Sequence, residues 1–274
     1  MAAIWKSGLI GTLNERNRTM NLKHAAYRIF SESMNLLGSS EPMRGLRVLT
    51  YHSIGTRLPN DPYGTSISET RFLAQLESYM RLSGTFPPTP LAAPETDSPA
   101  AAFSFDDGYR DTLKSAAPLL VDRNIPFTVF VPARHIGDSS GLHLTKSELR
   151  ELASLKNVRI GAHGDRHTPL TRLDDAELLE ELEGGRRRLE DLLGKPVDSM
   201  SYPYGAVDRR VRDAAKAAGF RTAACSLYGT NTPARDPLLL KRTEIVAFDS
   251  PRDFELKLRG HWDWFALRQG DPAA

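Results

Sequence analysis

The sequence predicts an α/β fold, and within that class a barrel of parallel strands. Three observations predict it. Apolar runs of strand length alternate with patterns typical of amphipathic helices, and the connections between them are short. About seven such repeats follow one another in roughly 220 residues, which suits a barrel better than an open sheet.

A cluster of breaker residues over 38–42 marks a linker. We therefore expect an N-terminal helical extension and linker over 1–45 and one large domain over 46–274. Residues 22–37 place apolar side chains on one helical face, which packs on the domain's own surface or contacts a membrane peripherally. Met20 is an alternative translation start to the first methionine.

Strands are predicted where short runs are rich in apolar, β-branched and aromatic residues: 46–54, 101–105, 127–133, 158–163, 199–205, 221–225 and 241–248. Helices are predicted between them from apolar periodicity: 72–83, 110–123, 145–155, 174–194 and 208–218. Asp174 and Glu177 form a capping box at the start of the longest helix, and Gly194 ends it. Residues 55–68 and 87–100 are rich in turn formers and indicate loops.

Composition narrows the function classes. The 274 residues are 40% hydrophobic and 26% charged, as in ordinary soluble globular proteins, and a net charge of +2 gives no reason to expect a nucleic acid partner. The one cysteine, Cys225, excludes an intrachain disulfide and is expected to be a buried strand residue. Charged residues interrupt the N-terminal segment, so we expect a cytoplasmic protein, with a peripheral place at the inner face of the membrane as the alternative.

Polar residues follow the predicted strands at their carboxyl ends, where α/β folds gather reactive groups. "FSFDDG" supplies Asp106 and Asp107, and "HGDRH" supplies His163 and His167. Histidines four apart on a helical turn lie on one side and can share an ion, and two histidines with one carboxylate are a common metal-binding set. The alternative is a pair of surface histidines and a plain Asp-Asp-Gly turn.

Two adjacent carboxylates permit a division of labour. One would complete the metal set, and the other would take a proton from a metal-bound water. Gly164 stands where the glutamate of an H-E-x-x-H metalloprotease would be, which excludes that class. In "YPYG", Pro203 fixes the backbone so that the amides of Tyr204 and Gly205 either face a developing oxyanion or belong to a plain turn.

These motifs resemble the polysaccharide deacetylase family, metal-dependent carbohydrate esterases that remove N-acetyl groups from amino sugars. The resemblance rests on "FSFDDG", "HGDRH" and "SYPYG" in that order, and it covers roughly residues 46–260. "LTYHSIG" and "LKRTEI" are similar to the bacterial exopolysaccharide branch. The resemblance implies a distorted (β/α) barrel of about seven parallel strands, here with an N-terminal helical extension, and a divalent metal ion, usually Zn²⁺.

The resemblance also implies roles for individual residues. Asp106 corresponds to the catalytic base. Asp107, His163 and His167 correspond to the metal ligands. Tyr204 corresponds to the residue whose backbone amide helps to hold the oxyanion.

The sequence departs from the family pattern at three places. Gly164 replaces a Ser or Thr, and Ser201 stands where an Arg often orders the base. Arg242 could substitute by reaching Asp106, or it forms an ordinary salt bridge at the barrel rim. The late histidine that many members use as general acid is missing, and His52 is either its replacement or a buried core histidine.

The expected function is a metal-dependent hydrolase that removes N-acetyl groups from an amino-sugar-containing glycan or glycan precursor, cleaving a linear amide bond. Two alternatives stay open: a deacylase of an O-acetyl ester or other small amide, and a catalytically dead glycan-binding protein on this fold. The expected substrate is an N-acetylated glycan or a lipid- or nucleotide-linked sugar, without nucleic acid or an obligate protein partner.

Overall fold

The structure, a computed structural model, describes residues 24–33, 43–59 and 61–272. The chain divides into two compact units, Met1–Glu41 and Pro42–Ala274. In the first unit residues 24–33 are helical; Met20 and the ends of the helix predicted over 22–37 lie outside the described residues, so its membrane contact stays a prediction. Within the described ranges, no helix combines the length and the apolarity needed to cross a bilayer.

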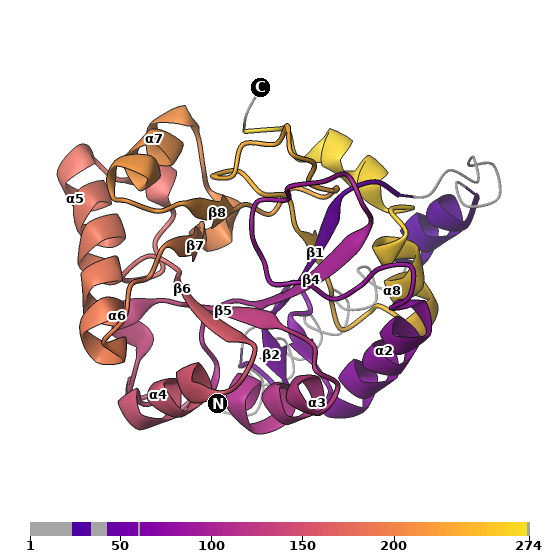
Figure 1. The fold of residues 1–274 in the computed structure, drawn as a ribbon, viewed down its shortest axis with the longest axis horizontal. Helices are drawn as coiled ribbons and strands as arrows, with labels where there is room; N and C mark the ends of the chain where they lie inside the picture. The colour runs from indigo at the N-terminus through magenta and orange to yellow at the C-terminus, as the bar shows by residue number, and fades with distance from the viewer. Residues whose placement is uncertain (1–23, 34–42, 60, 273–274) are drawn as a thin grey trace, which may run out of the picture. The chain divides into compact units, whose positions relative to one another are not determined.

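The second unit is built on seven parallel strands that form a curled half-barrel, which confirms the predicted fold class (Figure 1). Their order in the sheet is β8-β7-β6-β5-β4-β1-β9. A parallel bridge between Ala224 and Leu240 links the β8 edge to the segment that leads into β9. The strands are β1 (Leu46–Tyr51), β4 (Ala100–Phe105), β5 (Phe127–Val131), β6 (Val158–Ala162), β7 (Ser199–Ser201), β8 (Thr222–Ala224) and β9 (Thr243–Glu244).

Helices surround the outer face of the sheet in Figure 1, as crossover connections between parallel strands require. Asp174 and Glu177 form the predicted capping box, and Gly194 ends α6 in the left-handed conformation at φ +65°. The helical segments are α2 (Glu69–Leu82), η1 (Thr112–Ala116, π-helical), α3 (Ala117–Asp122), α4 (Lys146–Ser154), α5 (Asp175–Leu179), η4 (Glu180–Gly184, π-helical), α6 (Gly185–Leu193), α7 (Arg209–Ala217) and α8 (Pro251–Leu258).

Three predicted strands are interrupted or lose several residues in the structure, and the strands predicted over 127–133, 158–163 and 221–225 lose one or two residues at an end. The run 46–54 breaks at His52, and the residues beyond it form β2 (Ser53–Ile54), which pairs with β3 (Ser66–Ile67). The run 199–205 stops at β7 because the left-handed Tyr204, at φ 59°, bends the chain into a 3₁₀ turn. The run 241–248 keeps only β9, an edge strand that pairs with β1 alone.

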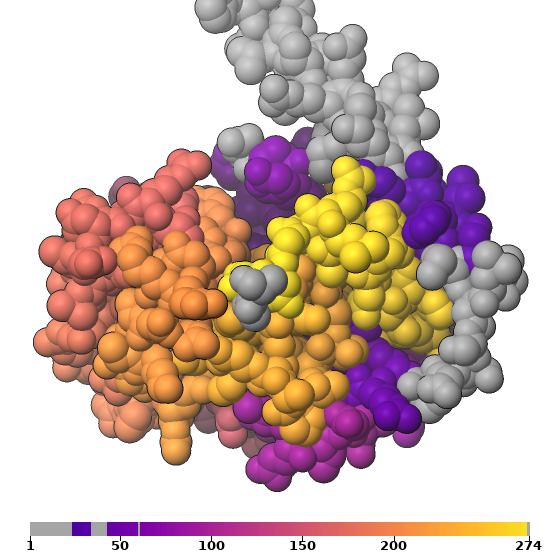
Figure 2. Space-filling model, turned by 90° about the horizontal axis from the view of Figure 1, so that it is seen from above, coloured from indigo at the N-terminus to yellow at the C-terminus, as the bar shows by residue number. Residues whose placement is uncertain are grey.

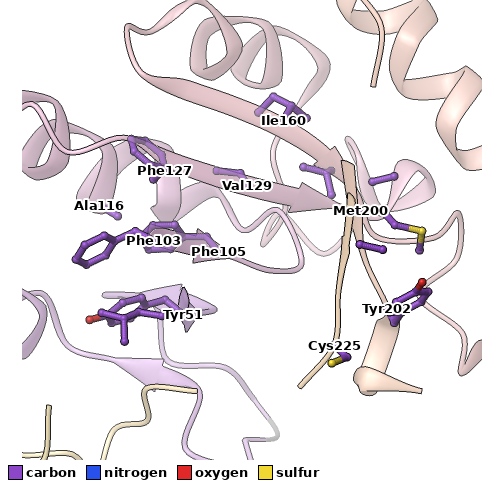
Figure 3. Close-up of a cluster of buried hydrophobic side chains, with 14 of the residues drawn as sticks. Tyr51, Phe103, Phe105, Ala116, Phe127, Val129, Ile160, Met200, Tyr202 and Cys225 are labelled. Carbon is purple, nitrogen blue, oxygen red and sulfur yellow. The ribbon is translucent and has the colours of Figure 1, made fainter. Parts of the chain in front are cut away.

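The sheet is buried on both faces, which explains its continuous apolar strands. Side chains alternate along each strand, and those of Tyr51, Phe103, Phe105 and Phe127 belong to the cluster on the helix side, where their rings gather (Figure 3). A smaller cluster on the opposite, inner face contains Val48, Ala102, Phe130, Ala224 and Leu240. The residues that follow the strands therefore project alternately outward and into the half-barrel.

The C-terminal segment closes over the β8 end of the sheet. The Gln269 side chain donates to the carbonyl of Ser226 over 2.8 Å and accepts from the amide of Tyr228 over 3.0 Å. Figure 2 shows this segment, in yellow, against the orange segment that contains β8.

Candidate active site

The carboxyl ends of the central strands lie close together. Phe105 pairs with Val129, and Val131 pairs with Ala162, so β4 and β6 end on either side of β5 and within two residues of the same level. Because Phe105 and Ala162 face the helices, the next residues, Asp106 and His163, project into the half-barrel. The strand periodicity and the register together bring the two motifs to one place.

The turn after β4 depends on two left-handed residues. Asp107 has φ 70° and Gly108 has φ 65°. A Cβ on Gly108 would lie 2.9 Å from the Val131 side chain, so only glycine fits there. This turn directs the Asp107 carboxylate toward the histidines.

Asp107, His163 and His167 converge on one point. The Asp107 Oδ1 atom lies 3.5 Å from His163 Nε2 and 3.2 Å from His167 Nε2. All three ligand atoms lie within 4.8 Å of one another. Asp107 Oδ1 is buried, and it has no hydrogen-bond partner in the described part of the chain. A buried carboxylate oxygen without a donor, facing two imidazole nitrogens, fits a divalent cation.

The orientation of His163 suits a ligand. Its Nδ1 atom lies 2.9 Å from the carbonyl oxygen of Ser201 and 2.6 Å from the Ser201 hydroxyl. A proton on Nδ1 that is donated to the carbonyl leaves a lone pair on Nε2, the atom that faces Asp107. Ser201 thus supports the imidazole.

The carboxylates and imidazoles of the cluster shift one another's pKa. Burial lowers the pKa of His163, but Asp106 and Asp107 raise it and prevail. Burial raises the pKa of Asp107, but His163 and His167 lower it, and the result lies well below the usual range. Both shifts reflect the mutual attraction of these groups in a buried place.

Arg242 holds Asp106 by two parallel hydrogen bonds, from Nη1 to Oδ1 over 2.7 Å and from Nη2 to Oδ2 over 2.8 Å. Its Nε donates to the carbonyl of Cys225 over 3.1 Å, and its guanidinium lies over the Phe130 ring. Burial raises the pKa of Asp106, but Arg242, followed by His163, lowers it, and the net pKa lies below the usual range. Asp106 is therefore an ionised and fixed carboxylate beside the cluster.

The turn over Pro203–Gly205 differs in part from the prediction. The amide of Gly205 donates to the carbonyl of Tyr202 over 2.9 Å, so it does not face an oxyanion, and that expectation was wrong. The amide of Tyr204 has no acceptor among the described residues. The Tyr204 ring is 65% exposed, and its centroid lies 4.6 Å from that of His167. Only the Tyr204 amide is therefore available at this edge of the site.

His52 lies at the same end of the sheet, directly after β1. It lies close enough to Asp106 and Asp107 to interact electrostatically with both. Its Nδ1 atom is buried without a hydrogen-bond partner within the described ranges. The chemical roles of His52 and of the other six residues singled out from the sequence stay predictions.

A row of aromatic and imidazole rings beside His167 was missed in the sequence. The His135 centroid lies 6.0 Å from that of His167 and 4.6 Å from that of His143. Tyr109 stacks on His143, whose Nδ1 pairs with Asp138 over 2.8 Å. Burial, and next Asp107, raise the pKa of Tyr109, so its hydroxyl remains protonated. The position of Tyr109, directly after "FDDG", was the one available signal.

Comparisons with known proteins agree with this geometry. Residues 93–223 match the family model described as polysaccharide deacetylase. YxkH of Bacillus subtilis, a protein assigned to the polysaccharide deacetylases, is 24% identical over 142 residues, which are 52% of this chain and 50% of YxkH. Chitin deacetylase 1 of Cryptococcus neoformans is 28% identical over 109 residues, which are 40% of this chain and 22% of that protein. The matched segment thus spans half or less of these relatives.

Solved structures share the fold. A polysaccharide deacetylase from Bacillus cereus, BC0361, superposes with a TM-score of 0.68 at 22% identity, covering 78% of this chain and 69% of the other. IcaB from Ammonifex degensii superposes with a TM-score of 0.64 at 21% identity, covering 80% of this chain and 97% of the other. At these identities the likeness concerns the fold alone.

Proposed function

This chain belongs to the polysaccharide deacetylase family, and we propose that it hydrolyses N-acetyl groups on amino sugars of a glycan or a glycan precursor. The observation that carries the proposal is the convergence of Asp107, His163 and His167 beside a second, separately held carboxylate, Asp106. One set of groups suits a cation, and the other is left to accept a proton.

Asp107, His163 and His167 would hold a divalent metal ion, for which one oxygen and two nitrogen donors favour Zn²⁺. When bound, the ion supplies a Lewis acid that polarises the acetyl carbonyl and lowers the pKa of water. Ser201 keeps His163 in the ligating tautomer through its carbonyl oxygen.

Asp106 is the proposed base. The paired contacts with Arg242 keep its carboxylate charged and fix its orientation. It accepts a proton from the attacking water as the oxygen of that water bonds to the acetyl carbon. The Arg242 guanidinium is itself anchored to the Cys225 carbonyl, so the base cannot turn away from the site.

Tyr204 and His52 are proposed to act on the acetyl oxygen and on the sugar nitrogen of the reacting amide, respectively. The free amide of Tyr204 donates to the developing oxyanion. The C–N bond then breaks, acetate leaves, and the sugar nitrogen takes a proton from His52. The unpaired, buried Nδ1 atom of His52 is the observation that favours this role.

A cavity adjoins one edge of the site, and of the proposed catalytic residues and metal ligands only Tyr204 lines it. This cavity, of about 410 Å³, is lined by hydroxyl, amide and carboxylate groups together with Val207 and Leu227. Such a mixture suits the hydroxyls and C–H faces of a sugar ring. A relative named for chitin deacetylation supports an N-acetylated amino sugar as the substrate. We extend this to lipid- or nucleotide-linked sugar precursors as members of the same chemical class.

The test is acetate release from a panel of N-acetylated and O-acetylated sugars, with and without a chelator. The proposal predicts release from N-acetyl substrates that the chelator abolishes and Zn²⁺ restores. Release from O-acetyl sugars alone would point to an esterase on the same site. Sugar binding without any release would point to a glycan-binding protein and would overturn the proposal.

A further inference from the structure

One buried carboxylate, that of Glu181, binds the backbone of the turn that carries His163 and His167. Glu181 Oε2 accepts the backbone amide of Asp165 over 2.8 Å and that of Arg166 over 3.0 Å. Glu181 is 1% exposed. Hydrogen bonds from two consecutive amides to one charged oxygen are short and strong, and they fix the two peptide planes that separate the histidines.

The helix that carries Glu181 is shaped to reach this turn. Glu181 lies in η4, the π-helical segment between α5 and α6, and single π-turns of this kind are frequent at functional sites. Four residues on, Gly185 lies against the same turn. A Cβ there would stand 2.9 Å from the carbonyl oxygen of Gly164 and 3.0 Å from the amide nitrogen of Asp165. Because Gly185 has no side chain, the backbone of the helix lies directly against the backbone of the turn.

Gly164, the residue after the first histidine, is matched to Glu181. Its φ of +69° favours glycine, and a Cβ added to it would lie 2.9 Å from Glu181 Oε2. A side chain at 164 and the carboxylate of 181 therefore compete for one space. The glycine leaves that space to the carboxylate.

The charged side chains around this turn form ion pairs with one another, and these pairs do not involve Asp107, His163 or His167. Asp165, which is fully buried, pairs with Arg134 Nε over 2.6 Å and with Arg188 Nη1 over 3.2 Å. Arg166 Nη1 lies 3.6 Å from Glu181 Oε1. Glu181 is thus a charged group with defined partners, and both of its strong hydrogen bonds go to the backbone between the two imidazoles.

We propose that Glu181 is a positioning residue for the metal site: its carboxylate sets the separation and orientation of His163 and His167, and Gly164 is glycine because that carboxylate fills the space beside it. The inference rests on the proposed function only in taking the two histidines as ligands. It concerns the affinity and geometry of the site and does not place Glu181 in contact with substrate.

The experiment measures metal binding rather than turnover. Metal-free wild-type protein and the variants Glu181→Leu, Glu181→Gln and Glu183→Leu are titrated with Zn²⁺ against a chromophoric chelator and with Co²⁺ by visible absorption. Glu183→Leu is the matched control, because it lies in the same π-turn and loses only a surface pair with Arg187. Circular dichroism and thermal unfolding establish that each variant folds.

Glu181→Leu is expected to weaken Zn²⁺ binding on the order of 10- to 100-fold and to change the Co²⁺ bands, as loss of an outer support of a metal ligand does. Glu181→Gln is expected to stay close to wild type, since one amide oxygen can accept both backbone bonds. The control is expected to match wild type. A folded Glu181→Leu protein with wild-type affinity and spectrum would overturn the proposal.

Hydrogen exchange of the wild-type protein provides a second measurement that needs no variant to fold. The amides of Asp165 and Arg166 are expected to be strongly protected, and exchange at the rate of open amides would overturn the proposal. The proposed function fails separately: if wild-type protein binds no metal, the metal site itself is wrong, whereas wild-type binding with no effect of Glu181→Leu refutes the positioning role alone.

Discussion

Two buried ion pairs in the second unit differ in what surrounds them. Arg242 and Asp106 lie at the carboxyl ends of the strands, next to three converging ligand atoms. Lys257 and Asp249 pair over 2.7 Å behind β9, where the ammonium also donates to the Glu244 carbonyl and lies over the Trp262 ring. Both pairs are buried, and the first lies beside the three side chains that we propose as metal ligands.

A buried charge does not by itself mark a functional site. Burial lowers the pKa of Lys257, but Asp249 raises it and prevails, so this ammonium is locked in its charged form. Its contacts with the Glu244 carbonyl and with the Asp249 carboxylate connect α8 to β9 and to the segment between them. Asp106 is also held charged, but its carboxylate stands 3.9 Å from His163 Nε2. Its neighbours in the proposed active site distinguish this pair, to which we assign a catalytic role, from the Lys257–Asp249 pair, to which we assign a structural one.

Removing Arg242 should have the largest effect, because it affects both stability and turnover. Arg242→Leu leaves Asp106 buried without its partner, and breaking such a pair costs about 3–5 kcal/mol of unfolding free energy. The base would also lose its orientation, so acetate release should fall in the folded fraction. Urea unfolding and initial rates measure the two effects. Arg242→Lys is the control, since it keeps the charge and loses the paired geometry.

Asp106→Asn should reduce turnover with little change in metal binding. Loss of a general base lowers kcat by about 10²- to 10⁴-fold. Zn²⁺ content should stay near that of wild type, because the proposed ligands are Asp107 and the two histidines. Steady-state acetate release and metal analysis of the same preparation measure this. Full activity in this variant would show that another group takes the proton.

In contrast to Asp106→Asn, Lys257→Met should lower stability and leave turnover unchanged. The loss of one partner leaves Asp249 buried with its charge, and the unfolding free energy should fall by about 3–5 kcal/mol. Below the unfolding transition, kcat should be unchanged because the pair lies behind the sheet. Urea unfolding together with kcat at low temperature tests this. A large loss of kcat in folded protein would end the distinction between the two pairs.

A third, more exposed pair should show the smallest effect. Arg110 and Glu148 form a bidentate ion pair, and Glu148 also caps α4. Arg110 lowers the pKa of Glu148 to about 2. A depressed folded pKa adds stability above the unfolded value near 4.5, and this stability is lost as the pH falls toward 2.

Glu148→Gln, which keeps the capping oxygen, should therefore cost about 1 kcal/mol at neutral pH, since the Arg110 side chain is 44% exposed and water screens the attraction. The difference from wild type should shrink between pH 4.5 and pH 2. Unfolding free energies measured across this range test the sign, and a difference that grows toward low pH would contradict it.

Much of the fold and the site core could be predicted because both depend on local patterns. Period-two alternation in "FSFDDG" fixes which carboxylate faces inward, and strand–helix alternation fixes a parallel sheet. Asp106, His163 and His167 are near strand ends, so the topology alone brings them together. Arg242 could be proposed from its residue type, although 136 positions separate it from Asp106.

The rest depends on packing that no local pattern carries. Glu181 lies in "EELEGGRRR", which resembles a solvated charged helix, and its burial follows from a π-turn and from the closeness of Gly185 to the histidine turn. The Gly205 amide donates to the Tyr202 carbonyl because Tyr204 adopts the left-handed conformation, which no local pattern predicted. The start of α8 was missed although Ser250 and Asp253 form a capping box around a proline at the first helical position.

Anomalous diffraction at the zinc edge from crystals of Zn²⁺-loaded protein tests the proposed metal site directly. One strong peak is expected about 2.0–2.2 Å from the Asp107 oxygen and from the Nε2 atoms of His163 and His167. Loaded crystals with no peak between these three side chains, or with zinc held only elsewhere, would contradict it.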